Sequence, residues 1–81
     1  MRIYRDNGFP NQYRDYFFEV IGSEYVSPLD GLTYVKVKMF GFKQYSSRTG
    51  ELLHDTHTKS TGREGGLHKS AVDGSTEYVG L

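Results

Sequence analysis

Hydrophobic and polar side chains alternate along the middle of the chain, and this alternation is the clearest structural signal in the sequence. In residues 32–44 (LTYVKVKMFGFKQ), Val35, Val37 and Met39 fall on one side of an extended strand, which we assign to the core. The opposite side carries two aromatic and two basic residues, Tyr34, Lys36, Lys38 and Phe40. Strict alternation past Gly41 would turn Lys43 toward the core, so we expect a β-bulge at Gly41 that shifts the phase by one residue.

The other strands are predicted from shorter runs. Alternation and β-branched or aromatic residues favour strands over residues 1–5, 13–22 and 51–59. Turn signals lie between them, at Asp-Asn-Gly in residues 6–8 and in a long connection over residues 22–31. Residues 67–73 fit either one helical turn or a short strand, and residues 76–81 fit a final short strand or an ordered tail.

Residues 46–51 (SSRTGE) predict a hairpin turn and with it a strand register. Arg48-Thr49-Gly50 fits a three-residue loop that ends with glycine in the left-handed region. That loop would place Tyr45 opposite Leu53 and Lys43 opposite Asp55. The second pair joins opposite charges across the strands, which supports the register.

Together these elements predict an all-β, mainly antiparallel protein with little or no helix. We expect a small twisted sheet of four or five strands, or an open barrel, in a single domain over residues 1–81. Residues 60–66 (STGREGG) contain three glycines and no apolar residue, which predicts a flexible Gly-rich loop. A single small sheet leaves one face uncovered, so homo-oligomerisation is also expected.

Composition changes this picture in three ways. The chain has no cysteine, no apolar run long enough to span a membrane and no signal-peptide pattern, so we expect a cytoplasmic protein without disulfides. Its formal net charge is zero, which argues against strongly electrostatic, nonspecific binding of nucleic acid. Residues 36–69 nevertheless hold seven basic and three acidic side chains, a local excess of four positive charges.

The sequence motifs do not support catalysis or metal binding. His54 and His57 would point to opposite faces of a strand, and their spacing matches no zinc pattern. None of the serines lies in a nucleophile-elbow context. We therefore expect no enzyme, no cofactor and no metal site.

The sequence leaves two hypotheses, and both are binding functions. The chain holds seven tyrosines and five phenylalanines, and tyrosine is enriched in binding surfaces. The first hypothesis is a non-enzymatic binding module that acts by protein–protein interaction, as a small virus- or phage-type accessory protein does when it inhibits a host factor. Its predicted partner-binding residues are Tyr25, Tyr34, Lys36, Lys38, Phe40, Tyr45 and Arg48.

The alternative is a protein that binds nucleic acid, a nucleotide or a phosphate through the basic region of residues 36–69. Backbone N–H groups of the Gly-rich loop would hold the phosphate, with nearby positive charge. Its predicted phosphate-binding residues are Arg63, His68 and Lys69. The sequence leaves the identity of the partner, the source of the protein and the oligomeric state open.

Overall fold

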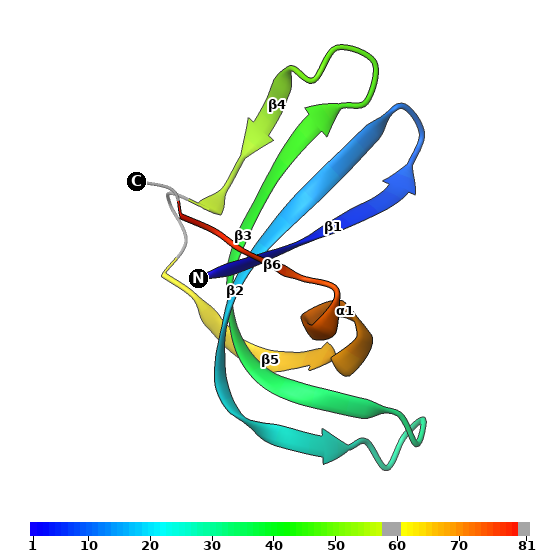
Figure 1. Ribbon diagram of the computed structural model, residues 1–81, viewed down its shortest axis with the longest axis vertical. Coiled ribbons are helices and arrows are strands. Elements are labelled where there is room, and N and C mark those ends of the chain that lie inside the picture. The colour runs from blue at the N-terminus through cyan, green and yellow to red at the C-terminus, as the bar shows by residue number, and fades with distance from the viewer. Residues whose placement is uncertain (58–60, 80–81) are drawn as a thin grey trace.

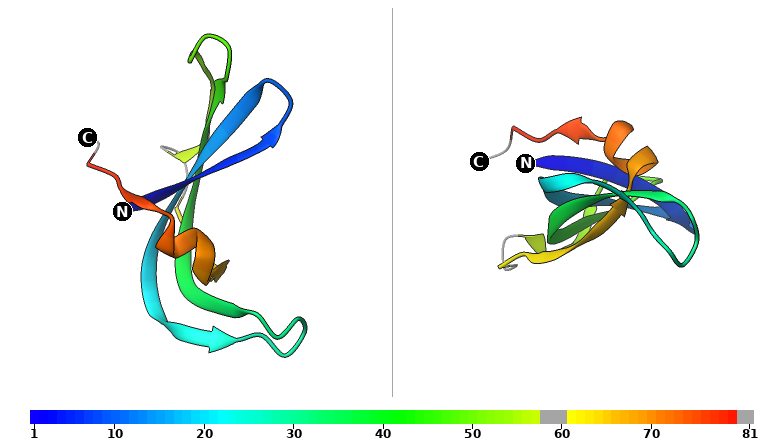
Figure 2. Two further views of the ribbon diagram at one scale, coloured as in Figure 1. Left: turned by 45° about the vertical axis from the view of Figure 1, so that its right-hand side comes forward. Right: turned by 90° about the horizontal axis from the view of Figure 1, so that it is seen from below.

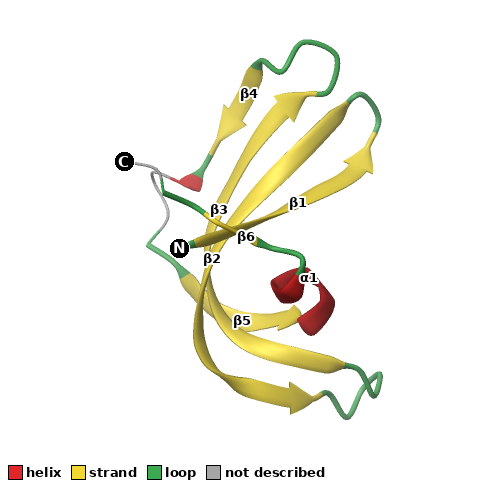
Figure 3. Cartoon of the chain, viewed as in Figure 1, coloured by secondary structure: helices red, strands yellow, loops and turns green. Residues whose placement is uncertain are grey.

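The computed structural model describes residues 1–57 and 61–79 of the chain (Figure 1). It consists of strands and one short helix, as the colouring by secondary structure shows (Figure 3). In chain order the elements are β1 (Arg2–Phe9), β2 (Gln12–Val26), β3 (Thr33–Ser46), β4 (Leu52–Asp55), β5 (Arg63–His68), α1 (Lys69–Asp73) and β6 (Thr76–Glu77).

All strand pairs are antiparallel, and β2 and β3 form the long central pair. The strand order is β4-β3-β2-β1-β6, while β5 pairs with β3 off this path. The sheet curls into a half-barrel around α1 (Figure 2). The predicted fold class, an all-β antiparallel sheet or open barrel with little helix, is therefore confirmed. None of the helices in the described part of the chain is long and apolar enough to cross a membrane.

A bulge at Gly41 divides β3 into two halves. Phe18 of β2 lies opposite Met39, whereas Tyr16 lies opposite Phe42, so β3 carries one extra residue between these two pairs. Gly41 has a φ of 93°, which glycine adopts without strain. We call residues 34–39, which pair with β5, the β5 half of β3, and residues 43–45, which pair with β4, the β4 half. The phase shift predicted from the sequence is thus confirmed.

The core lies on the face of the sheet that α1 covers, which we call the helix face. Its buried cluster is Phe18, Val35, Val37 and Leu67. Met39 and two residues of α1, Ala71 and Val72, pack against that cluster. Val35, Val37 and Met39 therefore point inward, as the alternation in β3 predicts.

The opposite face carries the lysines of β3, Lys36, Lys38 and Lys43, and we call it the lysine face. Lys43 lies opposite Asp15 and Lys38 opposite Glu19, so the face continues past the bulge. Phe17 is buried on this side, with 1% of its surface exposed. Its cover consists of His57, which stacks on its ring at 4.2 Å between centroids, and Tyr78, which meets it edge-on at 4.8 Å.

The β3–β4 hairpin differs from the prediction by one residue. Ser46 and Glu51 close the loop through the Ser46 N–H, and the Gly50 N–H donates to the Ser46 carbonyl at 2.8 Å, so the loop holds residues 47–50. Tyr45 consequently faces Leu52, and the predicted Tyr45–Leu53 pair is wrong. A register shift then restores the predicted pairing of Lys43 with Asp55.

Two turns lie later than predicted. The chain reverses at Pro10 and Asn11, where Asn11 has a φ of 57°, and not at residues 6–8, which belong to β1. Residues 22–26 belong to β2, so the connection predicted over residues 22–31 is restricted to residues 27–32. In this longer part of the β2–β3 pair, Tyr25 stacks on Tyr34.

The predicted loop over residues 60–66 also needs correction. Residues 63–66 lie in β5, where Gly65 pairs with Val37 and Gly66 with Lys36. Ser60 lies outside the described residues, and the flexibility of the segment stays a prediction. Residues 69–73 form α1, which is the helical alternative for the segment left undecided at 67–73.

Candidate binding surface

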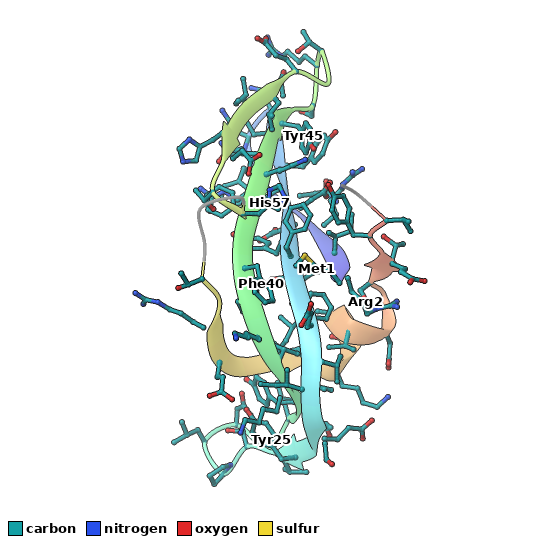
Figure 4. All side chains as sticks on the ribbon, turned by 90° about the vertical axis from the view of Figure 1, so that its left-hand side faces the viewer. Met1, Arg2, Tyr25, Phe40, Tyr45 and His57 are labelled. Atoms are coloured by element: carbon teal, nitrogen blue, oxygen red, sulfur yellow. The ribbon has the colours of Figure 1, made fainter. Side chains whose placement is uncertain are left out.

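Five of the predicted partner-binding residues share the lysine face in or next to the β5 half of β3. Tyr25 pairs with Tyr34, and Lys36 and Lys38 follow at alternate positions of β3. Phe40 continues this alternation up to the bulge. Figure 4 shows Tyr25 near one end of the long strand pair and Phe40 near its middle. The antiparallel register therefore gathers these side chains on one side of the sheet.

Aromatic rings form a continuous stack at the end of this surface. Tyr25 stacks on Tyr34 at 5.9 Å between ring centroids, and Tyr34 in turn lies 4.4 Å from the His68 ring. The Tyr25 ring reaches over β5, where its hydroxyl occupies the position that a Cβ on Gly66 would need. Gly66 thus makes room for Tyr25 to lie across the sheet.

Asp30 connects the aromatic stack to the β2–β3 loop. The Tyr34 hydroxyl donates to one carboxylate oxygen of Asp30 at 2.6 Å, and the Leu32 N–H donates to the other at 2.9 Å. These hydrogen bonds lower the pKa of Asp30, and the bond from Tyr34 to Asp30 raises the pKa of the Tyr34 phenol. The loop and the aromatic stack are therefore fixed to each other.

Each lysine of this surface faces carboxylates. Lys36 forms an ion pair with Glu64 at 3.8 Å. Lys38 lies between Glu19 on β2 and Glu64 on β5 in the strand register. Basic and acidic groups therefore alternate over the surface, and no uniformly positive area forms there.

A shallow cavity of about 410 Å³ opens in the same region. It is lined by Tyr25, Lys36, Glu64, Gly65 and Gly66. Because Gly65 and Gly66 lack side chains, backbone atoms of β5 form part of the lining. The cavity thus combines an aromatic ring, one positive charge, one negative charge and exposed peptide groups.

Exposed apolar side chains also occur on the β2–β3 hairpin, on both faces of the sheet. The tip residue Leu29 is 95% exposed, and Val26 is 64% exposed. Further exposed large apolar residues in this hairpin are Val20, Ile21 and Leu32. Apolar groups gathered at one end of a molecule are typical of an interaction surface.

The remaining two predicted partner-binding residues lie elsewhere. Tyr45 is in the β4 half, where it stacks on Tyr13 at 5.2 Å, and Figure 4 shows it near the other end of the strand pair from Tyr25. Arg48 lies in the exposed β3–β4 loop. The structure does not bring these two residues to the candidate surface.

The predicted phosphate-binding residues are not gathered either. Arg63 begins β5 opposite Met39 on the helix face, whereas His68 ends β5 on the lysine face. The ammonium group of Lys69 contacts Asp73 at 2.9 Å and Glu24 at 3.5 Å, and both carboxylates raise its pKa. This arrangement is unfavourable for one phosphate site.

A second cavity, of about 290 Å³, lies beside a buried carboxylate, which is Asp15. Arg5 binds both oxygens of Asp15, at 2.8 and 3.1 Å, and this pairing raises the pKa of Arg5. The charge is thus satisfied within the chain, and we assign the pair to stability. No group of three or more possible metal ligands comes together among residues 1–57 and 61–79.

Sequence reasoning missed Glu64, Gly65 and Gly66, because three glycines in a polar segment were interpreted as a loop. One signal was present. The strand predicted over residues 51–59 would pair only with the C-terminal part of β3. The buried positions Val35 and Val37 would then have no strand partner on that edge. A buried strand needs partners for its backbone groups, so a further strand was required there.

The comparisons with known proteins give no relative. The chain matches no protein-family model, and no curated protein and no solved structure is significantly similar to it.

Proposed function

We propose that this chain is a non-enzymatic binding protein that recognises another protein through the β5 half of its lysine face. One observation carries the proposal. Five residues nominated from the sequence share this face, and the basic groups among them are matched by carboxylates. The residues of the proposed interface are Tyr25, Tyr34, Lys36, Lys38 and Phe40.

Physical chemistry favours a protein as the partner. Tyrosine offers a flat apolar ring with a polar tip, and aromatic anchors contribute much of the binding energy at protein interfaces. Charges of alternating sign give specificity for one complementary partner. The exposed apolar residue Leu29 at the tip of the hairpin adds area that water leaves on binding.

Nucleic-acid binding remains the alternative. Aromatic and basic side chains on one sheet face also suit single-stranded nucleic acid. The carboxylates of Glu19 and Glu64 oppose it, because they would lie close to the phosphates of a bound strand. We therefore rank it second.

Three finer expectations from the sequence stay predictions. They are an origin as a virus- or phage-type accessory protein that inhibits a host factor, a cytoplasmic location and a homo-oligomeric state. The last can be measured directly, by sedimentation at micromolar concentration. A second copy would cover the same lysine face, so the Tyr25→Ala variant should weaken such an oligomer.

The test uses the immobilised chain to capture proteins from a nuclease-treated extract of the cells that make it. We expect Tyr25→Ala to reduce capture of a specific protein at least tenfold, because the variant removes the ring that caps the aromatic stack. Leu53→Ala is the matched control. Both side chains are 45% exposed, and Leu53 lies in β4, away from the proposed interface, so capture should persist.

Two results would reject the proposal. One is equal capture by the Tyr25→Ala variant and the wild-type chain. The other is a captured species that depends on nucleic acid, and that loses about a thousandfold or more in affinity between about 50 and 200 mM salt. The second result would establish the alternative instead.

A further inference from the structure

We propose that the outer edge of β5 accepts an extended segment of the partner protein as an added strand, with one large uncharged side chain in the cavity over Gly66. This inference rests on the proposed function and specifies how the partner is held.

The backbone of β5 is used on one side only. Its six residues pair with residues 34–39 of β3 in an uninterrupted register. Among the described residues, no backbone hydrogen bond joins its other edge to another segment. Figure 4 likewise shows no strand outside β5 on that side. A free edge offers unpaired N–H and C=O groups to an incoming strand.

The other free edges are less suited to pairing. Strand β4 has four residues and β6 has two. Strand β2 is free beyond Phe18, but its register with β3 shifts between Val20 and Glu24, and such bulges protect an edge. Strand β5 has no bulge and no proline, and it extends over about 20 Å at 3.3 Å per residue.

The two glycines of β5 allow a partner to approach closely. Gly65 has no atom within 4 Å of the place where a Cβ would stand. Glycine inside a strand commonly marks a site where another backbone comes near. Gly66 has no side chain on the lysine face, so the Tyr25 and Tyr34 rings lie against its backbone and the cavity opens beside them.

The cavity specifies the side chain that an added strand would place there. A strand beside β5 directs alternate side chains onto the lysine face, next to Gly66 and the cavity. Lys36 and Glu64 contribute opposite charges to the lining, so neither sign of charge is favoured in the occupant. Tyr25 offers a ring, and aromatic side chains commonly cover glycines on a neighbouring strand. We therefore expect an aromatic residue, tyrosine above all, at the centre of the bound segment.

The first experiment selects binders from a display library of random linear peptides on the immobilised chain. We expect peptides with a central aromatic residue between β-branched residues, and slower hydrogen exchange at alternate amides of residues 63–68 in the complex. N-methylation of alternate peptide amides should weaken binding about tenfold or more, because it removes main-chain hydrogen bonds.

The second experiment tests the cavity with two matched variants. Gly66→Val places a branched side chain where the Tyr25 hydroxyl lies, so affinity for the selected peptides should fall at least tenfold. Gly8→Val makes the same change at an exposed position of β1, away from β5, where only the Asp6 side chain lies near, and should alter affinity less than twofold. Circular dichroism establishes that both variants fold. If Gly66→Val does not fold, replacement of the central aromatic residue of the peptide by alanine makes the same test.

The inference is wrong if no peptide binds more tightly than about 100 µM, if bound peptides leave the β5 amides unprotected, or if N-methylation has no effect. In each case the capture assay decides the proposed function separately. If Tyr25→Ala still loses its protein partner, recognition through the lysine face stands without strand addition. If capture is unchanged, the proposed function fails even where peptides bind the edge.

Discussion

Phe17 and Phe18 are neighbours in β2, and both are almost completely buried, yet their surroundings differ. Phe18 lies on the helix face with Val35, Val37 and Leu67, in a cluster that α1 also contacts. Phe17 lies on the lysine face, where its cover consists of the rings of His57 and Tyr78. Both cover residues come from segments outside the long strands.

This difference explains where the proposed binding surface lies. The helix face is covered around Phe18 by aliphatic side chains and by α1. The cover on the lysine face is local to Phe17. Beyond it, Tyr25 and Lys36 stay exposed, which is the condition for recognising a partner.

The largest effect is expected from the helix face. Phe18→Ala should lower the free energy of unfolding by about 3–5 kcal/mol, because it removes a buried ring from a packed cluster. An 81-residue domain has a total stability of about 4–12 kcal/mol, so the variant is close to unfolding. Urea denaturation followed by circular dichroism measures it, with Phe18→Leu as the milder variant. A loss below 1 kcal/mol would mean that the helix face is not the main core.

The second effect tests the bulge that divides β3 into its two halves. Gly41→Ala would strain the backbone by about 1–2 kcal/mol at its positive φ. The new Cβ would also lie 2.6 Å from the Thr56 hydroxyl and 3.1 Å from the Thr56 backbone, which adds about 1–3 kcal/mol.

Gly50→Ala is the control, because Gly50 also has a positive φ but open space around its Cβ position. Gly50→Ala should therefore lower the free energy of unfolding only by the backbone strain of about 1–2 kcal/mol. Equal losses for the two variants in the same denaturation experiment would contradict the close contact of Gly41 with Thr56.

The third effect concerns the cover of Phe17. Tyr78→Ala should lower the free energy of unfolding by about 1–2 kcal/mol, because an edge-on aromatic contact and its buried area are lost. Tyr78→Phe retains the ring and should stay within about 0.5 kcal/mol of the wild type. If both variants behave alike, Tyr78 does not stabilise the lysine face through its ring.

The smallest effect is a pH dependence on the lysine face. Burial opposes ionisation of Asp55, but hydrogen bonds from the His57 ring and backbone N–H, together with the charge of Lys43, lower its pKa overall. The carboxylate therefore stabilises the fold above its unfolded pKa of about 3.9, and this contribution is lost as pH falls through the lower folded value.

The contribution of Asp55 should be less than about 1 kcal/mol. It is obtained as the difference in stability between the wild-type chain and Asp55→Asn, measured from neutral pH into the acid range. If the stability difference between the wild type and Asp55→Asn stays the same on acidification, the ionised carboxylate is not its source.

The sequence predicted what depends on local alternation. The inward side chains of Val35 and Val37, the bulge at Gly41 and the opposition of Lys43 to Asp55 all follow from side-chain period and phase. The predicted register of the β3–β4 hairpin is wrong by one residue. The Ser46 hydroxyl accepts hydrogen bonds from the Arg48 and Thr49 N–H groups, and these stabilise a longer loop.

Long-range pairing was not predictable in the same way. Strand β5 carries two glycines and little apolar surface, and it exists because β3 supplies a partner. The His57–Phe17–Tyr78 cluster joins residues far apart in sequence, with no shared pattern. Five residues of the proposed interface share one face because of their alternation and pairing on strands β2 and β3. The cavity beside them was missed because it depends on β5.

The contacts between the two ends of the chain have a consequence for how it folds. Hairpins β1–β2, β2–β3 and β3–β4 join neighbouring segments, so they can form early and locally. Arg2, in contrast, donates to the Ser75 hydroxyl at 2.6 Å and to the Ser75 carbonyl at 2.8 Å, which brings β6 against β1. During synthesis, β1 must wait until residues 75–77 have been made before that edge closes. Until then, its outer backbone is open to nascent neighbours and chaperones.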